Sequence, residues 1–162
     1  ARWRKAADRV EVLVGNTVRE AALFTARIPP LLRRMHSPRG GARVDRFLVA
    51  PFTRRIYGEG AVRFARRHAH AGGIGARYEF SWGVGRNPVA GAHISELPLL
   101  FPGHGVWEHT PLVEGHTWAQ VLYDGARLRR AWAEFARGHG AHGDARAGLR
   151  VFDLQDTAGG AD

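Results

Sequence analysis

Apolar and polar positions change their spacing along this chain, and the changes predict strands alternating with helices. Residues 9–15, RVEVLVG, have the dense β-branched pattern of a strand that is buried on both faces. A short helix is expected next, with Asn16 or Thr17 as its N-cap and Glu20 in its first turn. The segment Ile28-Pro29-Pro30 marks the end of that helix.

The middle of the chain predicts a connection, a helical region and a second strand. Residues 36–43 contain SPRGG, which is typical of a turn-rich connection. From residue 44 to residue 72 the apolar spacing is helical, with an interruption expected at Pro51. Residues 77–82 alternate large aromatic with polar side chains, so we expect a strand whose buried face carries Tyr78, Phe80 and Trp82.

The last third of the chain predicts a long helix and a final strand. Apolar residues recur at three and four residue spacings from about Thr117 to Arg137, which indicates an amphipathic helix. A glycine-rich loop, residues 138–148, leads into a strand at residues 149–155. No internal repeat or domain boundary interrupts the pattern, so residues 1–162 are expected to form a single partial domain, with about 139–162 as a loop and tail that hold the possible last strand.

Strands separated by helices indicate the α/β class, with a mostly parallel or mixed sheet covered on both faces. Only two or three strands can be identified in the sequence. A strand of buried type in so small a sheet would have an open edge, so we expect the chain to lack part of its own sheet.

Composition adds limits on the class of protein. The chain has 162 residues, 44% of them hydrophobic, which is enough for a folded core. It shows no run of about 18 apolar residues and no basic-then-apolar leader, so no membrane span or export signal is expected and the cytoplasm is slightly favoured. The absence of cysteine excludes disulfides, thiolate zinc sites and a cysteine nucleophile.

The formal net charge is +9, which raises the question of a nucleic-acid partner. The basic residues are almost all arginine, and they are scattered among apolar positions instead of forming a tail. The pairs are Arg33-Arg34, Arg54-Arg55, Arg66-Arg67 and Arg129-Arg130. This scatter does not favour nucleic-acid binding.

Four segments together resemble a known family. They are VLVGNTVREAALF, GARYEFSW, GAHISELPLLF and LRRAWAEFARG, and they occur in this order between residues 12 and 138. The third, residues 91–101, is similar to the catalytic-histidine segment of the type-B carboxylesterases, which include the bacterial para-nitrobenzyl esterases. The resemblance covers the C-terminal portion of that family and implies a partial α/β-hydrolase fold, with the C-terminal strands and helices of a mostly parallel sheet.

Carried over by position, the resemblance makes Glu20 the acid and His93 the general base of a catalytic triad. Such an enzyme hydrolyses a small-molecule carboxylic ester through an acyl-enzyme, without a metal or an organic cofactor. The chemistry suits these residue types, because a carboxylate bonded to one imidazole nitrogen leaves the other nitrogen free to take a proton from serine. Glu96, three residues after His93, is expected to anchor the loop.

The resemblance lacks one part of the triad. No Gly-x-Ser-x-Gly segment occurs, and the only serines are Ser37, Ser81 and Ser95. The family's nucleophile and oxyanion segments lie N-terminal to the glutamate. We therefore expect this chain to be inactive alone, either as a truncated remnant or as one part of a split enzyme whose nucleophilic serine lies on a second chain.

Simpler interpretations remain open at this stage. His93 taken alone could be structural, and Glu20 alone could be a carboxylate stabilised by a helix dipole. The scattered histidines do not have metal-ligand spacing, and Gly83 to Gly91 lacks the lysine of a phosphate loop. The alternative to a hydrolase is a non-catalytic basic α/β module that binds an anionic partner.

Overall fold

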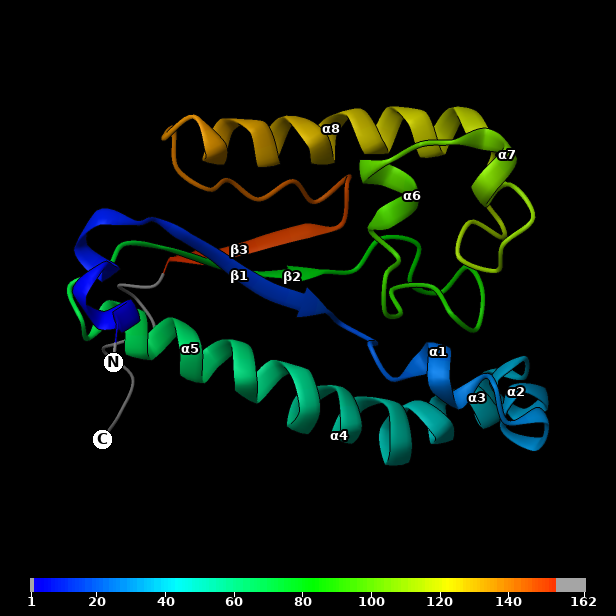
Figure 1. Ribbon diagram of the computed structural model, residues 1–162. Coiled ribbons are helices and arrows are strands. Elements are labelled where there is room, and N and C mark those ends of the chain that lie inside the picture. The colour runs from blue at the N-terminus through cyan, green and yellow to red at the C-terminus, as the bar shows by residue number, and fades with distance from the viewer. Residues whose placement is uncertain (1, 154–162) are drawn as a thin grey trace.

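A mixed three-stranded sheet lies between helices on its two faces (Figure 1). The computed structural model describes residues 2–153. The strands lie in the order β1 (Val12–Thr17), β2 (Gly75–Phe80) and β3 (Leu149–Asp153). β1 pairs parallel with β2, and β3 pairs antiparallel with β2. β1 is therefore an edge strand of the sheet that the described residues form.

Helical segments make up much of the rest of the structure. In chain order they are η1 (Arg2–Lys5), η2 (Ala7–Arg9), α1 (Ala22–Thr25), α2 (Pro29–Met35), α3 (Pro38–Val44), η3 (Asp45–Val49), α4 (Ala50–Phe52), η4 (Thr53–Gly58), α5 (Glu59–Ala69), α6 (Leu97–Leu100), α7 (His104–Trp107) and α8 (Trp118–Ala136). η1 and η2 are 3₁₀ turns, whereas η3 and η4 are π-helical. The helix formed by α4, η4 and α5 covers one face of the sheet and α8 covers the other (Figure 1).

The main hydrophobic core lies between α8 and the sheet. Phe80, Leu99, Val121 and Leu128 are all 0% exposed there. Burying a side chain of this size contributes about 1.5–3 kcal/mol. Gly125 allows α8 to approach α6 closely, since a Cβ at this position would lie 2.6 Å from the main-chain oxygen of Leu99. The long helix predicted at Thr117 to Arg137 is confirmed.

The start of α8 is fixed by a capping box. The Gln120 N–H donates to Thr117 Oγ1 at 3.3 Å, and the Thr117 N–H donates to Gln120 Oε1 at 2.9 Å. These two bonds satisfy N–H groups that the first helical turn leaves without partners. The predicted N-terminal boundary of this helix is therefore correct.

The sheet is mixed because the chain crosses back after α8. Residues 138–148 run back along the sheet under α8 (Figure 1). β3 consequently starts beside the end of β2, where the Ser81 N–H donates to the Gly148 oxygen at 2.7 Å. The expectation of a mostly parallel sheet is replaced by one parallel and one antiparallel pair. The final strand was predicted at 149–155, of which residues 154 and 155 lie outside the described part of the chain.

The predicted helix start after the first strand is wrong. Asn16 and Thr17 are the last two residues of β1, because they continue the ladder opposite Glu79 and Phe80. Glu20 lies in the turn between β1 and α1, ahead of the first helical turn. β1 is also mostly half-buried instead of buried on both faces.

Two other local predictions are corrected. Residues 36–43 are not a loop, since α3 begins at Pro38 with Ser37 as its N-cap, and the Gly40 N–H donates to Ser37 Oγ at 3.1 Å. The helix is also not interrupted at Pro51, which lies in α4 between the π-helical segments η3 and η4. The wider π turns accommodate a residue that has no N–H to donate.

Between residues 2 and 153, no helix combines the length and apolar character needed to cross a bilayer.

Candidate active site

Two parallel strands bring Glu20 and His93 together. Glu20 follows β1, and His93 lies in the loop that follows β2. Neighbouring parallel strands end at the same edge of a sheet, where ligand sites of α/β proteins assemble. His93 Nδ1 and Glu20 Oε2 are 2.6 Å apart, although 73 positions separate the two residues in the chain. The contact has the length of a strong, charge-assisted hydrogen bond.

The Glu20 carboxylate is held on both of its oxygens. Its side chain is 6% exposed, and Oε1 accepts a hydrogen bond of 2.7 Å from the Thr17 N–H. The His93 N–H also donates to the Glu20 main-chain oxygen at 3.3 Å. A carboxylate fixed in this way can hold an imidazole in one orientation and one tautomer.

The His93 ring is partly open to solvent and lies between two aromatic rings. Its side chain is 40% exposed. The Phe24 and Tyr57 ring centroids lie 5.6 and 5.7 Å from that of His93. Because Nδ1 contacts Glu20, Nε2 is the nitrogen that remains for proton transfer, and no hydrogen bond to it is made from the described residues.

The backbone of the histidine loop is tightly constrained. Gly91 has φ +66°, and a Cβ there would lie 2.6 Å from Val84 Cγ2. Ile94, immediately after His93, has φ +63°, a conformation that a β-branched residue rarely adopts. Strain of this kind is found where the surrounding structure fixes a functional side chain. Ala92, immediately before His93, is fully buried, which restricts movement of the loop.

Arg19 ties the two halves of the site together. Its Nη1 donates to the main-chain oxygen of Ala90 at 2.8 Å. The main-chain N–H of Arg19 donates to the main-chain oxygen of Gly91 at 2.9 Å. Its Nη2 pairs with Asp45 Oδ1 at 2.7 Å. The turn that carries Glu20, the loop that carries His93 and the start of η3 are thus linked through one guanidinium.

Glu96 occupies a different environment from Glu20. Burial raises the pKa of Glu96, its own main-chain N–H lowers it, the Glu20 charge raises it and His93 lowers it, with a net upward shift. Glu96 Oε2 is buried without a hydrogen-bond partner among the described residues, and no ion pair joins it to His93. The expectation that Glu96 anchors the loop stays a prediction.

Tyr78 is close enough to these carboxylates to feel their charge. Burial raises its pKa to about 12, and the charges of Glu96 and Glu20 add to this rise. The phenol therefore stays protonated at neutral pH and cannot serve as a base there.

None of the three serines is hydrogen-bonded to His93. Ser37 caps α3, and Ser81 Oγ donates to the Gly148 oxygen at 3.2 Å. Ser95 is fully buried, and its Oγ has no partner among residues 2–153. The site within the described residues thus contains an acid and a base but no bonded hydroxyl nucleophile.

Seven of the eight other histidines make side-chain contacts away from His93. His36, His68, His70 and His142 contact main-chain oxygens, His104 and His109 contact Glu108, and His116 stacks on Trp82. No three side chains of the described part gather in a way that could hold a metal ion.

The aromatic neighbours of His93 were not predicted. Phe24 lies four residues after Glu20, in α1, and its side chain is exposed. Tyr57 comes from η4, far from both segments in the sequence, and its approach to His93 has no sequence signal.

An acid and a histidine joined at the carboxyl ends of two parallel strands, within a small α/β domain, are compatible with a partial α/β-hydrolase fold. No family model matches the sequence. Over 133 residues the chain is 29% identical to a Rhodococcus erythropolis protein named probable N-octanoylanthranilate hydrolase AqdA2. The alignment takes in 80% of this chain and 28% of that protein, so the chain spans about 28% of the length of this relative.

Proposed function

We propose that this chain supplies the histidine and the acid of a serine hydrolase that cleaves carboxylic esters or N-acyl amides through an acyl-enzyme. The observation that carries the proposal is the 2.6 Å contact between His93 Nδ1 and the buried Glu20 carboxylate. The contact gives the pair the geometry, and not only the residue types, that the acid and the base of a hydrolytic triad require.

The proposed reaction uses each atom of the pair. His93 Nε2 takes the proton of a serine hydroxyl as the serine oxygen attacks the acyl carbon, and Glu20 stabilises the resulting imidazolium. The same nitrogen then returns the proton to the leaving alcohol or amine as the acyl-enzyme forms. Water, activated by His93, next attacks the acyl-enzyme and releases the carboxylic acid and the serine.

The nucleophile in this proposal comes from outside the 162 residues, since the sequence contains no Gly-x-Ser-x-Gly segment. The chain alone would then lack the covalent step and the oxyanion donors, which supply most of the rate enhancement. The short coverage of the similar hydrolase, 28% of its length, is consistent with this division.

The name of the relative suggests the substrate class. An N-acyl aryl amide carries an apolar acyl chain and an aromatic leaving group. Phe24 is an exposed aromatic side chain beside His93, and Tyr57 lies against the same imidazole. In our proposal these two rings contact the apolar part of an ester or an anilide as it reacts.

The test is hydrolysis of p-nitrophenyl butyrate and of octanoyl anilide by the purified chain, alone and mixed with a polypeptide that carries a Gly-x-Ser-x-Gly segment and is encoded beside it. We expect activity only in the mixture, and its loss in His93→Ala. His70→Ala is the matched control, because His70 is exposed and bonds only to the Arg66 oxygen of its own helix. Activity in neither condition, or equal activity of both variants, would contradict the proposal.

A second measurement needs no partner. A proton held between His93 Nδ1 and Glu20 Oε2 should give a strongly deshielded N–H resonance in the proton NMR spectrum of the chain. The resonance should disappear in Glu20→Ala and persist in His70→Ala. Its absence from the unsubstituted chain would remove the structural basis of the proposed dyad.

A further inference from the structure

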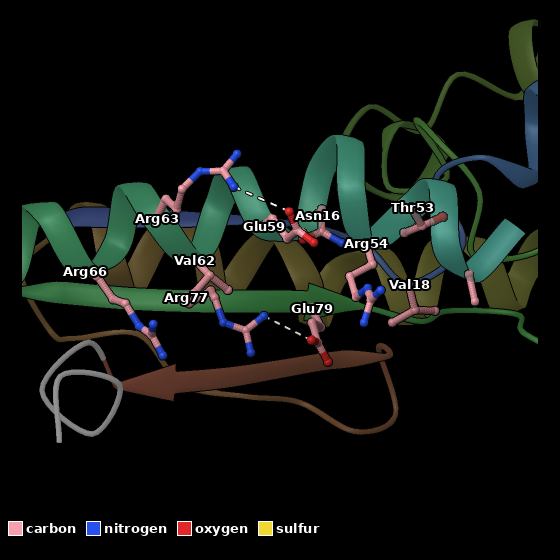
Figure 2. Close-up of a pocket in the computed structure, with 12 residues that line it drawn as sticks. Asn16, Val18, Thr53, Arg54, Glu59, Val62, Arg63, Arg66, Arg77 and Glu79 are labelled. Atoms are coloured by element: carbon pink, nitrogen blue, oxygen red, sulfur yellow. Dashed lines mark hydrogen bonds and ion pairs between the residues drawn. The ribbon is translucent and has the colours of Figure 1, made fainter. Parts of the chain in front are cut away.

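A second cavity lies between the helix formed by η4 and α5 and the face of the sheet (Figure 2). Its volume is about 620 Å³, which is in the range of sites that bind small molecules. Neither Glu20 nor His93 lines it. The hydrolase proposal assigns no role to this cavity.

The cavity is strongly basic. Its walls include four arginines and two glutamates, a formal charge of 4 − 2 = +2, namely Arg54, Arg63, Arg66, Arg77, Glu59 and Glu79. Both carboxylates are already engaged, Glu59 with Arg63 at 3.4 Å and Glu79 with Arg77 at 3.0 Å. Arg54 and Arg66 form no ion pair with any described residue. In Figure 2 the Arg63 side chain points away from the sheet, whereas Arg54, Arg66 and Arg77 extend along its face.

The side chain of Arg77 is held in one position in the wall of this cavity. This side chain is 12% exposed, its guanidinium lies 4.1 Å from the centroid of the Phe152 ring, and Glu79 holds one of its Nη atoms. Its Nε is buried without a hydrogen-bond partner among residues 2–153. A guanidinium that is held by stacking and by an ion pair loses little conformational entropy when it binds an oxyanion.

The cavity also has an apolar part. Val18, Ala50 and Val62 line it beside the arginines. An exposed basic face that is merely solvated does not need a concave wall of this kind. Arg67, the neighbour of Arg66 on α5, is such a solvated residue, because it is exposed and does not line the cavity.

We propose that this cavity binds a small organic anion. Arg66 and Arg77 would bind its oxyanion group, either a carboxylate or a phosphate, since paired N–H groups of guanidinium match both. Arg54 is 12 positions from Arg66, about 17 Å along the helix axis, so it attracts the anion from a distance and does not contact the same oxyanion. The apolar body of the ligand packs against Val18, Ala50 and Val62. This site is separate from the His93 site and does not depend on the proposed hydrolase activity.

The first test is calorimetric titration of the full chain with hexanoate, hexyl phosphate and 1-hexanol. We expect saturable binding of at least one anion and none of the neutral alcohol, and the two anions distinguish a carboxylate from a phosphate site. Arg66→Gln should weaken binding at least about tenfold, as expected when a charge-assisted contact is lost. Arg67→Gln, the matched control, should change the dissociation constant less than about twofold.

Three results would overturn the proposal. They are no saturable binding of either anion by the unsubstituted chain, equal binding of 1-hexanol, and an equal loss of affinity in Arg67→Gln. His93→Ala must bind as tightly as the unsubstituted chain, because binding lost in that variant would mean that the anion occupies the candidate active site instead.

A second test uses the unsubstituted chain and so does not depend on the folding of any variant. Phenylglyoxal modifies accessible arginines, and the modified positions can be mapped by mass spectrometry. The anion that binds should slow the modification of Arg66 at least about threefold and leave Arg67 unaffected, as expected for burial of a guanidinium group by a ligand. Uniform rates with and without the anion would contradict the proposed site.

Discussion

The two sides of the sheet differ in how completely they are packed. On the α8 side, Phe80, Val121 and Leu128 are fully buried. On the side of the helices between residues 22 and 69, six large apolar side chains are exposed: Phe24, Ile28, Phe47, Phe52, Ile56 and Phe64. The α8 side holds the larger buried side chains, although Phe101, Val106, Leu122 and Tyr123 are exposed there. The other side has a core of smaller side chains and exposes more apolar surface, of the kind that associates with another surface.

Two partly buried carboxyl groups, those of Asp144 and Glu96, differ in the direction of their pKa shifts. On the α8 side, burial alone would raise the pKa of Asp144, but the bonds from Arg127 and from the main-chain N–H groups of Ala147 and Arg146 lower it overall. At the N-cap of α6, which packs against α8, burial raises the pKa of Glu96, and Oε2 of this residue has no partner among residues 2–153. The two carboxyl groups thus have opposite pKa shifts because only Asp144 has hydrogen-bond donors around it that outweigh its burial.

The largest effect is expected from Glu20→Gln in the mixture that restores activity. Loss of the carboxylate removes the group that orients His93 and stabilises its charged form, so hydrolysis should fall by about 10⁴-fold. The initial rate of p-nitrophenyl butyrate hydrolysis measures it. Glu11→Gln is the matched control, because Glu11 is exposed and lies just before β1, at the end of the strand opposite Glu20. A loss of less than tenfold in Glu20→Gln would show that Glu20 is not the working acid.

The next largest effect is on the free energy of unfolding. Leu128→Ala should lower it by about 2–5 kcal/mol, because the fully buried site cannot collapse around the cavity. Phe52→Ala on the other side should change it by no more than about 0.5 kcal/mol, since Phe52 is half exposed. Urea denaturation of the full chain measures both. Equal losses would mean that the two sides are packed alike.

A smaller loss of stability is expected from a substitution in the loop between α8 and β3, which makes β3 run antiparallel to β2. Gly148 has φ +69°, and a Cβ there would lie 2.4 Å from the Trp82 nitrogen. Gly148→Ala should cost about 2–3 kcal/mol, from strain and from this clash. Gly138→Ala is the matched control, because Gly138 has φ +78° but open space around it. It should cost only about 1 kcal/mol. If both variants lose the same amount, the clash does not contribute.

The smallest effect concerns how the free energy of unfolding depends on pH, where Asp144 and Glu96 should act in opposite directions. The lowered pKa of Asp144 stabilises the fold above the ordinary aspartate pKa, and this contribution is lost as the pH falls through the lowered value. The raised pKa of Glu96 acts in the opposite sense, since its contribution is present in acid and is lost as the pH rises through the raised value. Asp144→Asn should thus destabilise the chain at neutral pH, and Glu96→Gln should stabilise it there.

Each change should be under about 1 kcal/mol, because both carboxyls are partly hydrated. Urea midpoints between pH 3 and pH 7, compared with those of the unsubstituted chain, measure the two trends. The same sign of change in both variants at neutral pH would contradict the assignment.

The sequence alone was sufficient to predict the secondary-structure elements in which apolar residues recur with a strong period. Residues 117–137 repeat over enough positions that tertiary packing only reinforces their preference, and this helix was predicted correctly. The strand predicted at residues 77–82 exists as β2, but it covers Gly75–Phe80, so Trp82 follows the strand instead of ending it. The pairing of Glu20 with His93 was expected from the family resemblance, and their contact is found in the structure. Their catalytic role stays a proposal.

The missed features depend on contacts between distant segments. Asn16 and Thr17 continue β1 because β2 offers them partners, and their preference for helix caps is overridden. The α3 helix follows a serine-proline start that was interpreted as a turn. The arginine-lined cavity brings together side chains from a helix and a strand. In the sequence these arginines are only scattered among apolar positions, so their positions did not predict a site.

The separation of Glu20 and His93 along the chain has a kinetic consequence. The dyad exists only after β1 has paired with β2, a parallel pairing that closes a loop containing α1 through α5. Closing so long a loop costs entropy that local helix formation does not, so such contacts form slowly. During refolding, the far-ultraviolet signal of the helices should therefore recover before the deshielded proton between His93 and Glu20 appears. Competence for catalysis would then be among the last properties that this chain acquires.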